Sequence, residues 1–203
     1  FDTAYGPESG AVIDALTSFE GKTKDVRWRT LQLVQAGYAQ VSDAVNPDQS
    51  VVVYAAAVVH SPSRRRLVAR VGVDGAYKLW AGGTELARVD VDLGGALDRD
   101  AWGVELHKGE NLLLLKLSGE NRGQLGFYFR FTDEKGAPVT LKSRSALDGV
   151  AAGAQSRTKR KTFQVADPST AAQGVARKAR VDPEAFVDAA FVARTLRWLD
   201  PTT

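Results

Sequence analysis

The side chains that could do acid–base or metal chemistry are few and scattered. Among 203 residues there are two histidines, His60 and His107, and no cysteine. Each histidine stands beside a turn signal, and neither has a second ligand or an orienting carboxylate at a useful spacing. We therefore expect both to be exposed turn residues. Because the sequence also has no nucleophile elbow and no phosphate-binding glycine loop before a helix, it predicts no catalytic residue and no enzyme.

Aspartates gather in one segment that we expect to be a loop between two strands. Asp90, Asp92, Asp98 and Asp100 offer the oxygen ligands that calcium prefers. Arg99 lies among them and would neutralise part of their charge, so a solvated acidic loop is the interpretation that we favour. A structural calcium ion is the one cofactor that this pattern leaves open.

One tryptophan has the setting of a ligand-stacking residue. In the segment 77–80, strand alternation places Trp80 and Lys78 on the face opposite Tyr77 and Leu79. If Tyr77 and Leu79 are core residues, Trp80 is at least partly exposed at the end of a strand. An exposed indole beside polar groups is typical of sugar binding, so the predicted ligand site is Trp80, Lys78, Arg88 and Asp90. The alternative is that Trp80 packs under a neighbouring loop.

The elements that would position these residues are predicted to be strands. Apolar and polar residues alternate, or apolar residues run continuously, in short stretches separated by turn residues. The expected strands are 26–31, 51–59, 67–73, 77–80, 84–87, 102–106, 111–117 and 125–131. Trp28 and Trp102 are expected to be buried within theirs, and 51–59, rich in β-branched residues, is expected to be covered on both faces.

Two dipeptides, Asp74-Gly75 and Gly82-Gly83, are strong hairpin signals. Short strands at turn spacings of about ten residues, without helical periods between them, favour an antiparallel sandwich. The predicted fold class is mainly β: an antiparallel β-sandwich of the jelly-roll, galactose-binding-like kind with a short C-terminal helical tail.

The domain organisation follows from a change in composition. We expect a β-sandwich module over 1–141, a basic linker over 142–166, and a helical tail over 167–203 that could begin a helical repeat. Residues 142–203 hold 11 Lys and Arg against 6 Asp and Glu. In the tail, helices are predicted to begin at Asp167-Pro168 and Asp182-Pro183, and the second has apolar residues at helical spacing up to Leu199.

Two basic runs, 64–66 and 157–161, contain no interleaved aromatic residues, so we expect solvated charge and no nucleic-acid partner. No stretch of the sequence is long and apolar enough for a membrane span. The chain does not begin with Met or with a targeting pattern, and we interpret it as a piece of a longer protein.

The stretch from Tyr54 to Gly136 resembles sugar-binding-like domains of the galactose-binding-like superfamily, found beside glycosidases and in large bacterial proteins with tetratricopeptide repeats. The resemblance lies in 71–75, in 77–83 with its Trp80-Ala81-Gly82-Gly83 turn, in 106–111 and in 126–130. The family's Trp-x-Asn-Gly turn has Gly82 in place of the Asn, so any ligand role of that Asn is lost.

This resemblance implies a non-catalytic binding or interaction module of a larger bacterial protein, with an unidentified glycan or protein partner. An extracytoplasmic location is what the resemblance favours. The alternative function is a structural or protein-docking domain without a small-molecule ligand, since fold alone does not decide function. The oligomeric state is not predicted.

Overall fold

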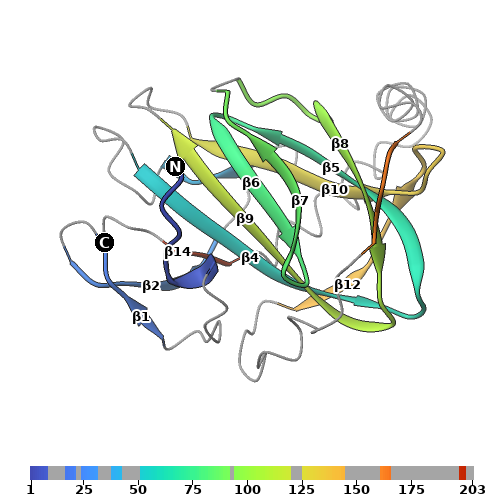
Figure 1. Cartoon of the computed structure of the whole chain (residues 1–203), viewed down its shortest axis with the longest axis horizontal. Coiled ribbons are helices and arrows are strands. Elements are labelled where there is room, and N and C mark those ends of the chain that lie inside the picture. Colours follow the sequence, from blue (N-terminus) through green and yellow to red (C-terminus); the bar gives the residue numbers. More distant parts are fainter. Residues whose placement is uncertain are drawn as a thin grey trace.

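The computed structural model describes residues 1–8, 17–21, 24–31, 38–42, 51–91, 94–119, 125–144, 161–165 and 197–199 (Figure 1). Nearly every regular element in this part of the chain is a strand, and every strand pair is antiparallel. The prediction of a mainly β, antiparallel fold is therefore confirmed. The exception is one 3-10 turn, η1 (Gly6–Glu8).

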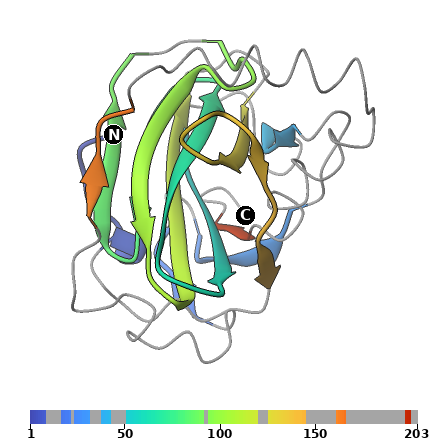
Figure 2. The same ribbon diagram turned by 90° about the vertical axis from the view of Figure 1, so that its right-hand side faces the viewer.

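The strands form two sheets, which lie one behind the other in Figure 1 and are turned by 90° in Figure 2. The larger sheet has the order β1 (Ser18–Phe19), β2 (Val26–Thr30), β14 (Arg197–Leu199), β4 (Val51–Ser61), β9 (Gly109–Gly119), β6 (Ala76–Ala81) and β7 (Thr84–Val89), with β12 (Lys142–Arg144) also paired to β4. The smaller sheet has the order β11 (Pro138–Val139), β10 (Gly126–Thr132), β5 (Arg65–Val73), β8 (Asp100–Leu106) and β13 (Thr162–Phe163), with β3 (Ala39–Gln40) also paired to β10.

The main core lies between the two sheets. It is built from alternate residues of both, as period-two burial requires. Tyr77 and Leu79 of β6 and Phe127 of β10 are at most 1% exposed. Trp102 is half-buried against the same core. The predicted inward faces of 67–73, 77–80 and 125–131 are therefore confirmed.

A second apolar cluster covers part of the larger sheet on the opposite side, which we call the outer face. Its buried members are Val26, Trp28, Tyr54, Ala56, Val58, Leu112 and Leu114. Strand β4 contributes to both clusters, through Val53 and Ala55 on one side and Tyr54 and Ala56 on the other. This two-sided burial explains why its sequence is a continuous apolar run, as predicted.

The predicted hairpin at Asp74-Gly75 is wrong. Strands β5 and β6 follow one another in the chain, but β5 pairs with β8 and β10 and β6 pairs with β7 and β9. The turn thus carries the chain from one sheet to the other. Gly75 has a φ of 108°, and a Cβ there would lie 2.3 Å from the Ser118 carbonyl oxygen, so the position requires glycine for this crossing.

The hairpin predicted at Gly82-Gly83 joins β6 to β7, and both glycines have positive φ, at 51° and 77°. Such a turn matches the right-handed twist of the two strands. The register shifts between Leu79 and Trp80. This hairpin holds Trp80 at the end of β6, close to the turn.

The predicted linker 142–166 contains two strands, since β12 at its beginning pairs with β4 and β13 (162–163) pairs with β8. Most of the predicted helical tail lies outside the described residues. Its described part, Arg197–Leu199, is strand β14 between β2 and β4, so the structure shows no helix that reaches Leu199. No helix in the described part of the chain is long and apolar enough to cross a membrane.

Candidate functional site

The outer face of the larger sheet carries Trp80 and Lys78. Their neighbours Tyr77 and Leu79 are buried in the main core, so alternation turns Lys78 and Trp80 the other way, as predicted. Trp80 is half-buried and packs against the outer apolar cluster. Beside it is a hollow of about 80 Å³ lined by Pro7, Glu8, Trp80, Gly83, Leu112 and Leu114.

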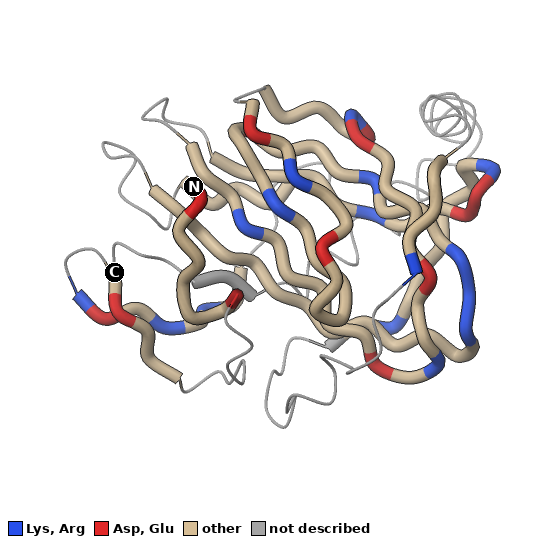
Figure 3. The backbone as a smooth tube through the Cα atoms, viewed as in Figure 1, with Lys and Arg blue, Asp and Glu red and all other residues tan. Residues whose placement is uncertain are grey.

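Three cations stand side by side on this face. Lys78 of β6 is the register partner of Arg88 on β7 and of Lys116 on β9. Figure 3 shows the basic positions of β7, β6 and β9 on adjacent strands. Like charges directly opposite one another destabilise a sheet unless anions compensate them. The row Arg88–Lys78–Lys116 therefore needs acidic partners.

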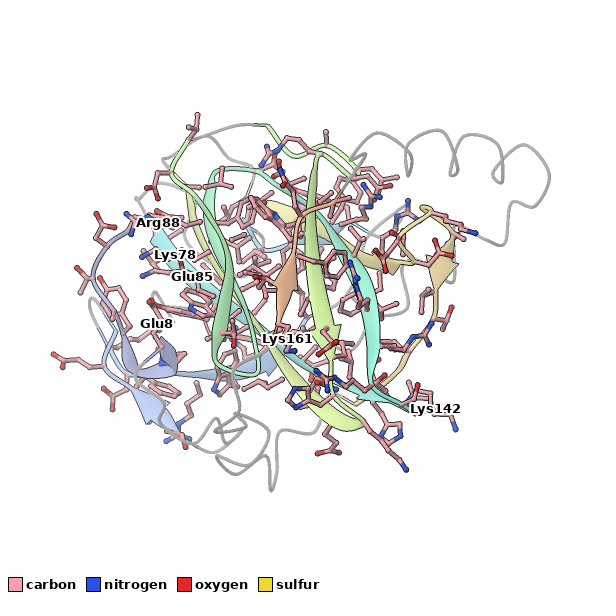
Figure 4. All side chains as sticks on the ribbon, turned by 45° about the vertical axis from the view of Figure 1, so that its right-hand side comes forward. Glu8, Lys78, Glu85, Arg88, Lys142 and Lys161 are labelled. Atoms are coloured by element: carbon pink, nitrogen blue, oxygen red, sulfur yellow. The ribbon has the colours of Figure 1, made fainter. Side chains whose placement is uncertain are left out.

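Those partners come from segment Phe1–Glu8, which runs along the outer face (Figures 1 and 4). The Asp2 carboxylate lies 2.5 Å from Arg88 Nη2 and 3.9 Å from Lys78 Nζ. Lys116 Nζ donates to Glu8 Oε1 at 2.6 Å and to the Thr3 carbonyl oxygen at 2.7 Å. Every cation of the row is thus paired with a group of this segment.

Aromatic rings of the same segment cover the two lysines. The Phe1 ring centroid is 4.9 Å from Lys78 Nζ and 5.6 Å from Lys116 Nζ, within the range of a cation–π contact. Tyr5 packs edge-on against Tyr54 with centroids 6.5 Å apart. As a result Lys78 is 5% exposed and Lys116 is fully buried, although both lie on the outer side of the sheet.

Charge and burial shift two ionisable groups here in opposite directions. The hydrogen bond from Arg88, followed by the charges of Arg88 and Lys78, lowers the pKa of the Asp2 carboxyl below its usual range. Burial, followed by its hydrogen bond to Glu8, raises the pKa of the Tyr54 hydroxyl. Asp2 is therefore an anion and Tyr54 a neutral donor at neutral pH.

Of the four predicted ligand-site residues, three lie in one group. Lys78 and Arg88 are register partners, and Arg88 Nε also donates to the Asp90 carboxylate at 2.9 and 3.1 Å. Trp80 lies two residues along β6 from Lys78. The structure thus brings Lys78, Arg88 and Asp90 together on the outer face, with Lys78 covered by Phe1 and not open to solvent.

Of the four aspartates predicted for calcium, the three that the structure describes, Asp90, Asp98 and Asp100, do not form a metal site. Asp98 is buried and pairs with Arg130 through both carboxylate oxygens, while Asp100 accepts from Tyr77 at 2.8 Å and Arg99 at 3.2 Å. Asp90 pairs with Arg88, and Asp92 lies outside the described residues. Where the structure describes the chain, it contains no group of three or more acidic or histidine side chains arranged for a metal ion. The carboxylates of Asp90, Asp98 and Asp100 are instead acceptors for arginine and tyrosine.

Neither histidine joins a site in the described structure. His60 is exposed at the end of β4, and His107 lies in the turn before β9, where its backbone N–H donates to Asn111 Oδ1 at 3.0 Å. The basic run 64–66 is largely exposed, and Arg64 and Arg66 pair with Glu105 and Glu134. His60 and most of the run 64–66 are thus exposed, as expected, whereas His107 is half-buried and His60 belongs to a strand and not to a turn.

Sequence reasoning missed Lys116 and the whole of segment Phe1–Glu8. A signal for Lys116 was present, since a lysine in the apolar run 111–117 falls on the same face as Leu112 and Leu114. A buried cation in such a run requires an acidic partner. The sequence contains no sign that this partner is Glu8, more than a hundred residues away.

No protein family and no curated protein matches this sequence. Among solved structures, a selenomethionine-labelled β-glucosidase from Kluyveromyces marxianus is similar over 66% of this chain and 19% of that chain, with 10% identity and a TM-score of 0.40. The β-glucosidase from the same organism in complex with glucose is similar over 88% of this chain and 20% of that chain, with 11% identity and a TM-score of 0.38. This chain thus spans about a fifth of the enzyme's length, and the likeness is too weak to assign a fold family or a function.

Proposed function

We propose that this chain is a non-catalytic binding module and that its ligand is a carbohydrate held on the outer face around Trp80. The observation that carries the proposal is the half-buried indole beside a hollow that Glu8 also lines. An apolar ring face next to a few fixed polar groups is the usual composition of such a site. The jelly-roll, galactose-binding-like architecture is part of the same proposal.

The charges near Trp80 support binding without catalysis. A general acid of a glycosidase needs a carboxyl whose pKa is raised. The pKa of Asp2 is lowered by Arg88, and Glu8 and Asp90 accept hydrogen bonds from Lys116 and Arg88. Asp2 is thus suited to position groups and not to donate a proton, and Glu8 and Asp90 are engaged as acceptors.

Isothermal titration with neutral and acidic oligosaccharides, selected on a glycan array, tests the proposal. Trp80→Ala should abolish binding to the best saccharide, because the stacking surface is removed. Trp102→Phe is the matched control, since Trp102 packs against the main core and not on the outer face. Equal affinity of Trp80→Ala and wild type, or no binding to any saccharide, would refute the proposal; the second outcome would favour a structural or protein-docking domain.

A further inference from the structure

Asp2 occupies the most accessible part of the cation row. Its side chain is 77% exposed, whereas Glu8, at the other end of the segment, is 11% exposed. Arg88, which holds Asp2, is itself 43% exposed and also binds Asp90. The contacts at this end of the segment are thus open to solvent and to competing anions, while those at Lys116 are closed.

Segment Phe1–Glu8 is not a strand of the larger sheet. Its contacts with Arg88, Lys78 and Lys116 are ion pairs, cation–π contacts and one hydrogen bond to a carbonyl group. The part of the segment that is held by the exposed Asp2–Arg88 contact, without ladder hydrogen bonds, opens at a lower free energy than the strands beneath it. Phe1 and Asp2 can therefore leave the sheet while its strands stay folded.

The shape and charge of Phe1 and Asp2 indicate what kind of ligand could replace them on the sheet. Phe1 presents a flat six-membered ring over Lys78, and Asp2 presents a carboxylate to Lys78 and Arg88. A six-membered ring that carries a carboxylate is also the structure of a uronic acid residue. An acidic peptide would also supply a carboxylate, as Asp2 does; the half-buried indole of Trp80 on the same face of β6 favours a saccharide, because a second sugar ring could stack on it.

Resting on the proposed function, we infer that Lys78 and Arg88 form a subsite for the carboxylate of an acidic, uronate-containing saccharide, and that Asp2 occupies this subsite in the free protein. Lys78 and Trp80 are two residues apart on one face of β6, about 7 Å along the strand. Arg88 stands opposite Lys78 on the neighbouring strand, about 5 Å away. A ring stacked on Trp80 would have its neighbour, with the carboxylate, above these two cations.

Segment and saccharide compete for the same cations under this arrangement. A site that is occupied internally for most of the time binds its ligand with an affinity reduced by the fraction of time it is free. Removal of the Asp2 charge should therefore raise the affinity for an acidic saccharide. Removal of the Arg88 charge should lower it, because the charge-assisted contact is lost from the bound state.

The test is calorimetric titration of the full chain with trigalacturonate and, as a matched neutral ligand, its methyl ester. We expect Asp2→Asn to bind trigalacturonate at least about threefold more tightly than wild type, and Arg88→Gln and Lys78→Gln to lose about tenfold or more. Arg64→Gln should bind like wild type, since Arg64 is an exposed arginine that pairs with Glu105 of the smaller sheet and does not lie on the outer face. If Lys78→Gln fails to fold, Arg88→Gln, at a more exposed position, carries the same test.

The outcomes separate this inference from the proposed function. Equal, Trp80-dependent binding of the acid and its ester would overturn the carboxylate subsite and leave carbohydrate binding in place. No binding of either compound, nor of any other saccharide, would overturn both. Binding of trigalacturonate that does not change in Arg88→Gln or Asp2→Asn, or binding of an acidic peptide such as tetraglutamate in its place, would overturn the subsite.

Discussion

At the scale of single residues, Lys116 shows how a buried charge is accommodated on the outer face. Its ammonium group is fully buried and donates to Glu8 and to the Thr3 carbonyl, with the rings of Tyr5 and Tyr54 about 5.5 Å away. Taking a charge out of water costs several kcal/mol, and the pair offsets this only while both members are present. The pair is therefore a source of specificity for the docking of segment Phe1–Glu8.

We predict that Glu8→Ala lowers the free energy of unfolding by about 3 kcal/mol, because it leaves Lys116 charged and unpaired in a buried position. Lys116→Met keeps the side-chain length without the charge. It should lower the free energy of unfolding by less in a Glu8→Ala background than in the wild type. Urea unfolding of the two single variants, the double variant and the wild type gives the coupling energy. A coupling energy below about 0.5 kcal/mol would show that the pair does not act as a unit.

At the scale of elements, a glycine in β5 sets how closely the loop before β8 approaches the smaller sheet. A Cβ at Gly72 would lie 1.7 Å from the Ala96 carbonyl oxygen, whereas a Cβ at Gly94 in the same loop would meet nothing within 4 Å. We predict that Gly72→Ala destabilises by about 3 kcal/mol or more, since backbone on both sides must move. Gly94→Ala should change stability by less than about 0.5 kcal/mol in the same urea titration. Similar stabilities of the two variants would contradict the close approach.

The strands were predictable and their partners were not. Alternation is a local property, and it placed β2, β4, β5, β9 and β10 within a few residues of where they lie. Whether Asp74-Gly75 forms a hairpin or a crossing depends on the strands that pair with β5 and β6. These partners include β10 and β9, which come later in the chain. A positive-φ glycine serves a crossing between sheets as well as a hairpin, so the dipeptide could not distinguish them.

The candidate site was predictable where it lies on a strand. The burial of Tyr77 and Leu79 fixes the direction of Lys78 and Trp80, and the hairpin brings Arg88 opposite Lys78. Segment Phe1–Glu8 has no periodicity, so its position on the sheet follows only from contacts such as Asp2 with Arg88. The partner of Asp98 could not be predicted for a related reason, because Arg130, which binds it, is 32 residues away in the sequence.

At the scale of the whole molecule, a polar link joins the two sheets through the core. The Tyr77 hydroxyl of β6 donates to Asp100 of β8 at 2.8 Å and accepts from Trp102 Nε1 at 2.9 Å. Burial holds the pKa of the Tyr77 hydroxyl well above its usual value. The hydrogen bond from Trp102 lowers this pKa, whereas the hydrogen bond to Asp100 and the Asp100 charge raise it. Apolar packing is non-directional, so these hydrogen bonds help to fix how the sheets lie against each other.

We predict that Tyr77→Phe lowers the free energy of unfolding by about 1–3 kcal/mol at pH 8, because Asp100 and Trp102 each lose a partner. A tyrosine pKa that is raised in the folded state gives stability that is present below about pH 10 and is lost as the pH rises toward the folded value. Above pH 10, the free energy of unfolding of the wild type should therefore fall by about 1.4 kcal/mol per pH unit because of this one proton. That of Tyr77→Phe should not show this contribution. The difference between the two proteins, measured by urea unfolding at pH 8 and pH 11, should narrow accordingly, since all other titrating groups are shared. A difference that stays constant from pH 8 to pH 11 would mean that Tyr77 ionises as readily in the folded chain as in the unfolded one, and that the link between the sheets does not depend on its proton.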